Sequence, residues 1–210
     1  MPLVAPEHRP TLREELARLP TGRRRAIVVL LVVAVPALVV LTVRGAEPDG
    51  VHVVRERPIA FNLRHPADFR ELRPAAGELL RLERPGVDAF IVEPLRLPAY
   101  RGDAGGVLPI EAAHEIDALR RRYPALEPVE EGKARVNQVA GYSLVFRVSR
   151  KPRRYGRLVL LPQPVPGARD GVKLLMFATP AGGAGKARDV GARGLLKTPY
   201  RSFRFGTAAP

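Results

Sequence analysis

Six cationic side chains gather within eleven residues and form the densest group of chemically active residues in this 210-residue sequence. They are Arg147, Arg150, Lys151, Arg153, Arg154 and Arg157. Guanidinium and ammonium groups donate charge-assisted hydrogen bonds to phosphates and carboxylates, and Tyr155 adds a ring for stacking. The cluster therefore predicts a contact for an anionic partner. The alternative interpretation is a charged hairpin tip that protects an edge strand from aggregation.

Residue types that build catalytic and metal centres are sparse in the sequence. There is no cysteine, which excludes disulfides, thiolate metal sites and a cysteine nucleophile. The histidines are His8, His52, His65 and His114, and the serines are Ser143, Ser149 and Ser202. No histidine pair has metal-ligand spacing, and no serine lies in a hydrolase motif. Glu130 and Glu131 are adjacent, so an extended chain would point them to opposite faces. We therefore expect no catalytic residue, no metal site and no cofactor.

A glycine-rich segment at residues 181–186 partly matches a phosphate-binding loop. That motif requires glycine at position 180 and a hydroxyl at position 187, where this chain has Pro180 and Ala187. Two of its four fixed positions are therefore absent. We predict a flexible glycine linker here instead.

The net charge of +14 is unevenly distributed along the chain. Residues 50–131 carry 12 basic and 14 acidic side chains, a net of −2, whereas residues 132–210 carry 16 basic and 2 acidic ones, a net of +14. Such a field favours an anionic partner. Arginine outnumbers lysine thirty to five, so the composition of a GC-rich genome is an alternative source of part of this charge.

Residues 26–43 are predicted to form a transmembrane helix. They contain no charge, and Thr42 is their only polar side chain. A helix of this length extends about 27 Å, close to the hydrocarbon thickness of a bilayer at about 30 Å. Pro36 interrupts the segment, but membrane helices tolerate proline. The alternative is a buried helix of a soluble protein.

The charges beside this segment predict its orientation. Arg23, Arg24 and Arg25 precede it and only Arg44 directly follows it, so we place the N-terminus in the cytoplasm and the C-terminal domain outside. A cleaved signal peptide is the rival interpretation, but Arg44 stands where a small residue would precede a cut after Ala46. The predicted organisation is a basic cytoplasmic tail (1–25), a transmembrane helix (26–43), a linker (44–50) and an extracytoplasmic domain (51–206).

The remaining pattern predicts an α+β domain, an antiparallel β-sheet packed with one or two helices. Alternating apolar residues predict strands at 51–54, 59–63, 80–84, 89–93, 142–148, 158–161, 172–178 and 200–205. Residues 150–157 are expected to form a hairpin turn. A helix over 109–123 has proline at its start, acids early, arginines late and an apolar stripe. Residues 187–196 are expected to form a second, weaker helix.

This chain resembles the PsbP/Mog1-like domains, including exported lipoproteins of mycobacterial type, at the level of the fold. The matching features are the run from Phe61 to Pro66, the strand from Tyr142 to Phe146 and the run from Tyr200 to Phe203. The resemblance spans about 150 residues. This chain lacks the anchoring cysteine of those lipoproteins, so the predicted transmembrane helix would serve as its anchor. The resemblance implies a non-enzymatic binding or assembly module.

These observations favour a single-pass membrane protein whose extracytoplasmic domain binds an anionic lipid, a cell-wall polymer or an acidic protein. We expect no nucleic-acid partner, because the predicted compartment holds none and the basic cluster lacks interleaved aromatic residues. Two alternatives stay open. One is a cell-envelope enzyme whose active site combines residues distant in sequence, and the other is a structural subunit of a membrane complex.

Overall fold

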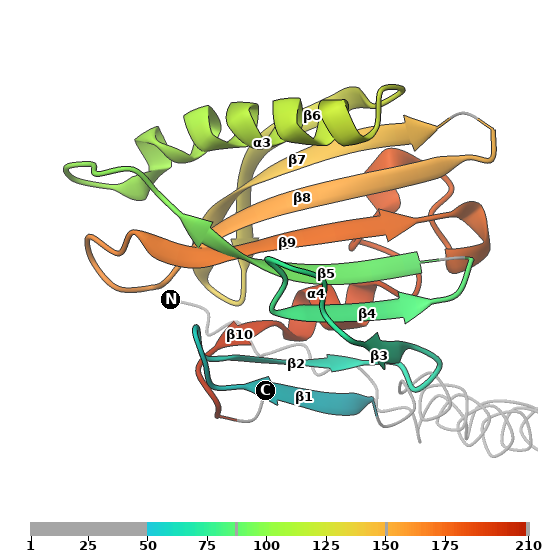
Figure 1. The fold of residues 1–210 in the computed structure, drawn as a ribbon, viewed down its shortest axis with the longest axis horizontal. Coiled ribbons are helices and arrows are strands. Elements are labelled where there is room, and N and C mark those ends of the chain that lie inside the picture. Colours follow the sequence, from blue (N-terminus) through green and yellow to red (C-terminus); the bar gives the residue numbers. More distant parts are fainter. Residues whose placement is uncertain (1–49, 87, 150, 209–210) are drawn as a thin grey trace, which may run out of the picture. The chain divides into compact units, whose positions relative to one another are not determined.

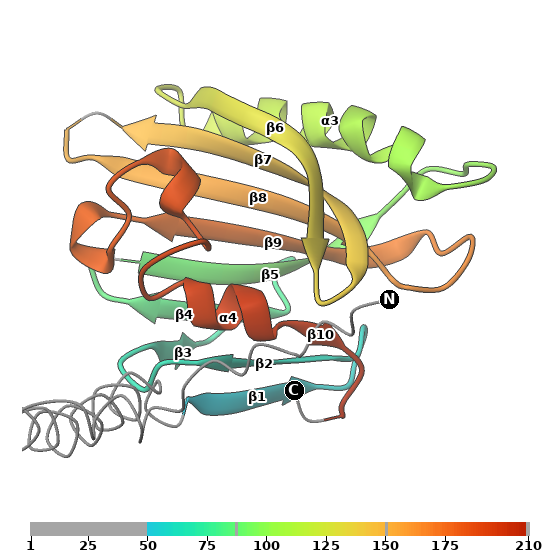
Figure 2. The same ribbon diagram turned by 180° about the vertical axis from the view of Figure 1, so that it is seen from behind.

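The computed structural model describes residues 50–86, 88–149 and 151–208, and within them seven antiparallel strands form one large sheet (Figures 1 and 2). In spatial order the strands are β3 (Arg70–Leu72), β4 (Leu80–Arg84), β5 (Asp88–Arg96), β9 (Asp170–Ala178), β8 (Arg154–Pro162), β7 (Val139–Ser149) and β6 (Glu127–Val136). Strands β6 to β9 follow one another along the chain. The N-terminal strands β3 to β5 then extend the sheet beyond β9.

The predicted tail and transmembrane helix lie outside the described residues. Within the described part, no helix is long and apolar enough to cross a membrane.

Helix α3 (Leu108–Arg122) covers one face of the large sheet (Figure 1). Its buried side chains, Leu108, Ala112, Ile116 and Leu119, pack on sheet residues such as Phe146. The helix begins with proline in its first turn and ends with three arginines, as the sequence predicts. This confirms the predicted helix within one residue at each end.

A half-buried lysine joins this helix to the sheet. Lys173 on β9 places its Nζ 2.9 Å from Glu115 of α3 and 3.1 Å from Glu93 of β5. Burial alone would lower the pKa of the ammonium, but the hydrogen bond and charge of Glu115, helped by Glu93, raise it above its usual value. The lysine is therefore held in its charged form.

A second set of elements covers the opposite face (Figure 2). It comprises a small antiparallel sheet of β1 (Val51–Arg55), β2 (Phe61–His65) and β10 (Arg204–Phe205), together with the short helix α4 (Lys197–Ser202). Phe61 and Phe203 stack there with ring centroids 5.6 Å apart. Buried residues from both sheets form this second core.

Two asparagine side chains hold the C-terminal segment in place. The buried Asn62 donates from Nδ2 to the carbonyl oxygens of Gly206 and Ala208, both at 2.8 Å. Asn137, in the turn between β6 and β7, donates to the carbonyl oxygens of Arg201 at 2.6 Å and Phe203 at 2.7 Å. The end of the described chain is thereby tied to β2 and to the β6–β7 turn.

The structure confirms the antiparallel α+β domain but corrects several local predictions. Residues 187–196 form no α-helix; they contain the 3₁₀ helix η3 (Ala187–Asp189), followed by turns at the left-handed Gly191 and Gly194. Half of the expected strand at 200–205 lies in α4, and only Arg204 and Phe205 pair as a strand, β10. Strands β3 and β6 have no counterpart in the sequence-based prediction.

Candidate anion-binding site

The structure does not bring the six predicted cations onto one surface. Lys151 and Arg153 are exposed in the turn between β7 and β8, and Arg150 lies outside the described residues. Arg147 on β7 forms an ion pair with Glu127 on β6, with Nη1 and Oε2 2.9 Å apart. Because its charge is already paired, Arg147 contributes less to a contact for an external anion.

Arg154 and Arg157 lie on opposite faces of strand β8. They are three residues apart, and side chains alternate between faces along a strand. The guanidinium carbon of Arg154 lies 4.8 Å from the ring centroid of Phe177, which belongs to the core under α3. Arg157 instead lies near Tyr200 of α4, its guanidinium carbon 5.7 Å from that ring centroid. The predicted cluster is therefore divided between a hairpin tip and the two faces of the sheet.

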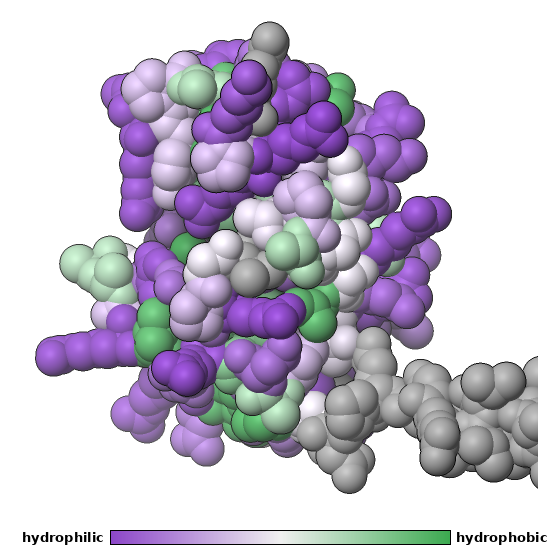
Figure 3. All heavy atoms as spheres, turned by 90° about the vertical axis from the view of Figure 1, so that its right-hand side faces the viewer, coloured by the Kyte–Doolittle hydropathy of each residue, from purple (hydrophilic) through white to green (hydrophobic). Residues whose placement is uncertain are grey.

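The hairpin tip, defined here as Lys151 and Arg153, has further polar neighbours. The hydroxyl of Tyr155, at the base of the tip, donates to the carbonyl oxygen of Gly185 at 3.1 Å. This contact brings the exposed Lys186 to the same end of the sheet. Figure 3, which views the molecule from that end, shows hydrophilic side chains gathered over its upper part. Among the described residues, neither tip cation has a carboxylate within 4.0 Å.

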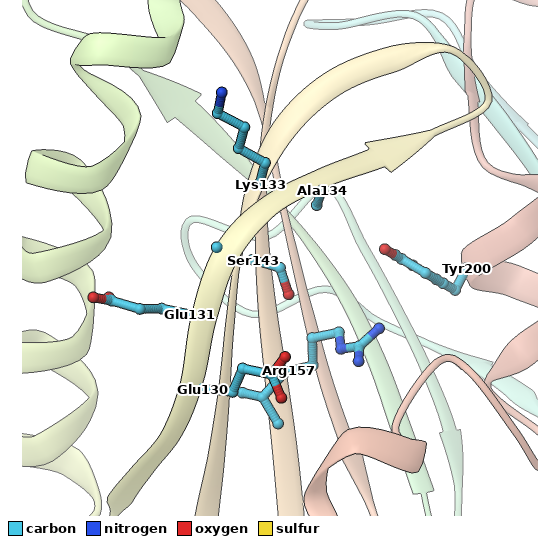
Figure 4. A pocket seen from close by; sticks show the side chains of 9 residues that line it. Glu130, Glu131, Lys133, Ala134, Ser143, Arg157 and Tyr200 are labelled. Atoms are coloured by element: carbon cyan, nitrogen blue, oxygen red, sulfur yellow. The ribbon is translucent and has the colours of Figure 1, made fainter.

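A pocket of about 200 Å³ lies beside Arg157, between strands β6, β7 and β8 and helix α4 (Figure 4). Its lining residues are Glu130, Glu131, Gly132, Lys133, Ala134, Ser143, Val145, Arg157 and Tyr200. Figure 4 shows the side chains of Glu130, Ser143, Arg157 and Tyr200 at one open space, whereas those of Glu131 and Lys133 point away from it. This follows from the register, which pairs Gly132 with Ser143 and Glu131 with Leu144, whose side chain lies under α3.

Some polar groups inside the pocket have partners in the protein and others do not. Arg157 Nη2 donates to the carbonyl oxygen of Arg188 at 3.1 Å, while its buried Nε has no partner among the described residues. Glu130 forms an ion pair with the side chain of Arg188, so its charge is compensated. The pocket thus combines a guanidinium that has no carboxylate partner, two hydroxyl groups, and the Glu130 carboxylate that Arg188 pairs.

Sequence reasoning included Arg157 but missed Ser143 and Tyr200 as neighbours. Side chains alternate along a strand, so the sequence alone indicates that Ser143 and Leu144 lie on opposite faces of the sheet. The position of Tyr200 depends on the path of residues 179–200 across the sheet. No sequence pattern indicated that path.

The glycine-rich segment is packed against the sheet and is not the linker that the sequence predicted. Gly182 and Ala184 are buried. The segment begins with the 3₁₀ helix η2 (Pro180–Gly182), and the amide of Thr179 donates to Asp88 Oδ1 at 3.2 Å. Burial raises the pKa of the Asp88 carboxyl, whose second oxygen lacks a partner among the described residues.

The histidines of the described region lie apart from this pocket. His65 is buried, and its Nδ1 lies 2.8 Å from the carbonyl oxygen of Pro66. His52 and His114 are exposed. In residues 50–86, 88–149 and 151–208, no group of three histidine or carboxylate side chains is placed to hold a metal ion.

Comparisons with known proteins found likeness in structure but not in sequence. No protein-family model matches, and no curated protein sequence matches. LpqN of Mycobacterium tuberculosis, described as involved in cell envelope biogenesis, superposes with a TM-score of 0.51 at 13% identity over 74% of this chain and 90% of its own. Cyanobacterial PsbP from Synechocystis gives 0.51 at 10% identity over 75% and 92%. The Ran-binding protein Mog1p of Saccharomyces cerevisiae gives 0.47 at 10% identity over 74% and 95%.

At these identities the likeness concerns the fold alone, because one fold hosts many functions. The coverage includes nearly all of each neighbour, so the shared unit is a whole domain and not a common fragment. The comparisons therefore confirm the predicted fold-level resemblance to PsbP/Mog1-like domains.

Proposed function

We propose that this chain is a single-pass membrane protein whose α+β domain lies outside the cytoplasm and binds an anionic partner without catalysing a reaction. The observation that carries the proposal is the hairpin tip, where Lys151 and Arg153 are exposed and unpaired among the described residues. Exposed cations without protein partners are free to contact external anions. The charge surplus of residues 132–210 adds to their field.

The proposed membrane anchor favours one source for that anion. The uncharged residues 26–43 would hold the chain in the bilayer, and the linker of residues 44–50 reaches at most about 25 Å when fully extended. The domain would then stay close to the lipid surface. Anionic lipid headgroups are therefore the partner we favour over a cell-wall polymer or an acidic protein.

We propose a non-catalytic role because the carboxylates around the pocket are poorly placed for acid–base catalysis. Glu130 is paired with Arg188, and Glu131 points away from the open space. A general acid or base must reach the reacting group of a substrate in the required protonation state. The fold-level neighbours, which include a protein of cell envelope biogenesis, are consistent with a binding role.

Vesicle binding by the fragment of residues 50–210 tests this proposal. Phosphatidylcholine vesicles with and without phosphatidylglycerol are titrated over a salt series. Each cation near an anionic surface contributes on the order of 1 kcal/mol, so the double variant K151Q/R153Q should bind anionic vesicles about 30-fold more weakly. Binding should also fall as salt shortens the Debye length from about 10 Å.

A matched control separates the tip from the general field of the fragment. R101Q/R135Q also removes two exposed cations, from loops and strands at the other end of the large sheet. We expect it to weaken binding much less. Equal losses for the two double variants would refute a contact at the tip, and an absence of binding to anionic vesicles would refute the lipid partner.

A further inference from the structure

The guanidinium of Arg157 has fewer partners than a partly buried charge requires. The residue is half-buried, its Nε is buried without a hydrogen bond, and its Nη2 contacts only the carbonyl oxygen of Arg188. Among the described residues, no carboxylate lies within 4.0 Å of it. Removing a charge from water without a counter-charge is unfavourable. The ring of Tyr200 offers a cation–π contact, which leaves the Nε–H unpaired.

Two hydroxyl groups near this guanidinium also lack hydrogen-bond partners in the described part of the chain. They belong to Ser143 on β7 and Tyr200 on α4, and Figure 4 shows both side chains at the same open space as Arg157. A guanidinium and two hydroxyl groups are donors that an anionic oxygen accepts. The three groups come from separate elements, and the β-sheet register and the C-terminal segment bring them together.

The size and net charge of the pocket restrict its ligand. About 200 Å³ is smaller than the roughly 300–1,000 Å³ of sites for drug-sized molecules. Glu130 also faces this pocket but is paired with Arg188, and among the described residues no carboxylate lies within 4.0 Å of Arg157. The pocket is therefore suited to a small anion, or to the anionic end of a slightly larger molecule.

We propose that this pocket binds a small oxyanion, a carboxylate or a phosphate, through Arg157, Ser143 and Tyr200. The guanidinium supplies the charge and directed N–H donors, and the two hydroxyl groups complete the coordination of the oxygens. The ion pair between Glu130 and Arg188 forms one edge of the pocket. This site is separate from the hairpin tip, so it does not rest on binding of a lipid surface.

Ligand-observed NMR on the full-length chain in detergent tests the site. Inorganic phosphate is followed by ³¹P line broadening and acetate by ¹H saturation transfer. We expect saturable binding of at least one probe. Phosphate alone identifies a phosphate site, acetate alone a carboxylate site, and binding of both a general oxyanion site. Failure of both probes to bind at 50 mM, about a hundred times a submillimolar dissociation constant, would overturn the proposal.

Variants distinguish the pocket from general attraction by a basic protein. R157Q should weaken binding at least tenfold, because it removes the charged donor. S143A removes one hydroxyl with little effect on folding and should weaken binding severalfold. R153Q makes the same charge change at the hairpin tip and should leave the dissociation constant within twofold of wild type. Equal losses in R157Q and R153Q, or unchanged binding in both R157Q and S143A, would contradict the site.

The R157Q substitution could also disturb the segment around Arg188, whose carbonyl oxygen accepts a hydrogen bond from Arg157. Two further measurements separate such a disturbance from a loss of binding. Circular dichroism reports whether the variant is folded. R157K keeps the charge but loses the planar fork, and we expect binding between those of wild type and R157Q. The vesicle assay tests the hairpin tip with K151Q/R153Q, whereas the NMR assay tests the pocket with R157Q and S143A. A failure of the lipid proposal would therefore appear only in the first assay, and a failure of this site only in the second.

Discussion

Replacing Gly182 with alanine should destabilise the domain by about 2–4 kcal/mol, because the new methyl group would overlap a buried carboxylate. An ideal Cβ on Gly182 would lie 2.0 Å from Asp88 Oδ2, 2.1 Å from Oδ1 and 2.3 Å from Cγ. Asp88 is only 4% exposed, so its side chain has little room to move. The backbone at Gly182 is outside the left-handed region, so the penalty is steric and not conformational.

The magnitude combines two terms. Inserting a methyl group into a packed site costs about 1–3 kcal/mol. A displaced Asp88 would also lose the hydrogen bond from the Thr179 amide, worth about 1 kcal/mol. Gly132 on β6 is a matched control, since no atom lies within 4 Å of its ideal Cβ. G132A should therefore change the free energy of unfolding by less than about 1 kcal/mol.

Urea denaturation of the fragment of residues 50–210 measures these values, and a double-mutant cycle with D88A tests their cause. Alanine at position 88 removes the carboxylate, so the methyl group of G182A would enter the space that it leaves. We expect G182A to cost less than about 1 kcal/mol in the D88A background, a coupling of about 1–3 kcal/mol. Equal costs of G182A in both backgrounds would show that the glycine segment does not rest on Asp88.

Three further predictions concern pH, metals and topology. Burial raises the pKa of Asp88 above its usual 3.8, so the folded state binds this proton more tightly and the free energy of unfolding should fall as pH rises from just above 3.8. D88N should flatten that part of the curve in urea denaturation between pH 3 and 7, and an unchanged slope would exclude Asp88 as its source. The fragment of residues 50–210 should unfold cooperatively with the same midpoint with and without EDTA, and loss of structure on chelation would indicate a metal site. Protease added to intact cells, or to spheroplasts where an outer membrane is present, should digest the chain after Gly50 and spare the tail. The reason is that Arg23, Arg24 and Arg25 favour a cytoplasmic N-terminus. Protection of the domain would reverse the predicted orientation.

The sequence predicted the elements whose burial imposes a regular pattern. In α3, Ala112, Ile116 and Leu119 recur at helical spacing because one face packs on the sheet. Strands β4 and β5 pair across the expected turn, with Arg84 opposite Asp88. Such elements have one dry face, and apolar residues mark it in the sequence.

Strand β6 was missed because it is a largely exposed edge strand. Six of its ten residues are exposed and only Val136 is buried, and residues 127–132 show no alternation of apolar and polar side chains. A register shift between Pro128 and Glu130 interrupts the ladder further. Charges, proline and irregular pairing protect an exposed edge from further strand pairing, and they also remove the strand signal from the sequence.

The C-terminal segment was mispredicted because tertiary contacts determine its path. Alternation of Tyr200, Ser202 and Arg204 is compatible with a strand, yet residues 197–202 form α4. Ser202 Oγ donates to the carbonyl oxygen of Thr198 at 2.8 Å within that helix. Hydrogen bonds from Asn137 hold the carbonyl groups of Arg201, in the last turn of that helix, and of Phe203, which follows it. These partners are more than 60 residues apart, and short-range patterns do not report them.

The candidate site was predicted only in part for a related reason. A run of cations marks the hairpin in the sequence, but alternation along β8 separates Arg154 from Arg157 by the thickness of the sheet. The pocket arises only when β7, β8 and α4 meet. Ser143 and Tyr200 become neighbours through that assembly.

Lysine footprinting in intact membranes tests the central claim, an anionic contact at the hairpin tip, without any mutation. Lys151 and Lys133 are both exposed in the structure, and only Lys151 belongs to the tip. An amine-reactive acetylating reagent, followed by mass spectrometry, gives the ratio of their modification rates. We predict that Lys151 reacts more slowly than Lys133 in the membrane and that high salt removes this protection, because screening weakens contacts between exposed charges. Equal reactivity of the two lysines at low salt, or protection of Lys151 that salt leaves unchanged, would contradict the claim.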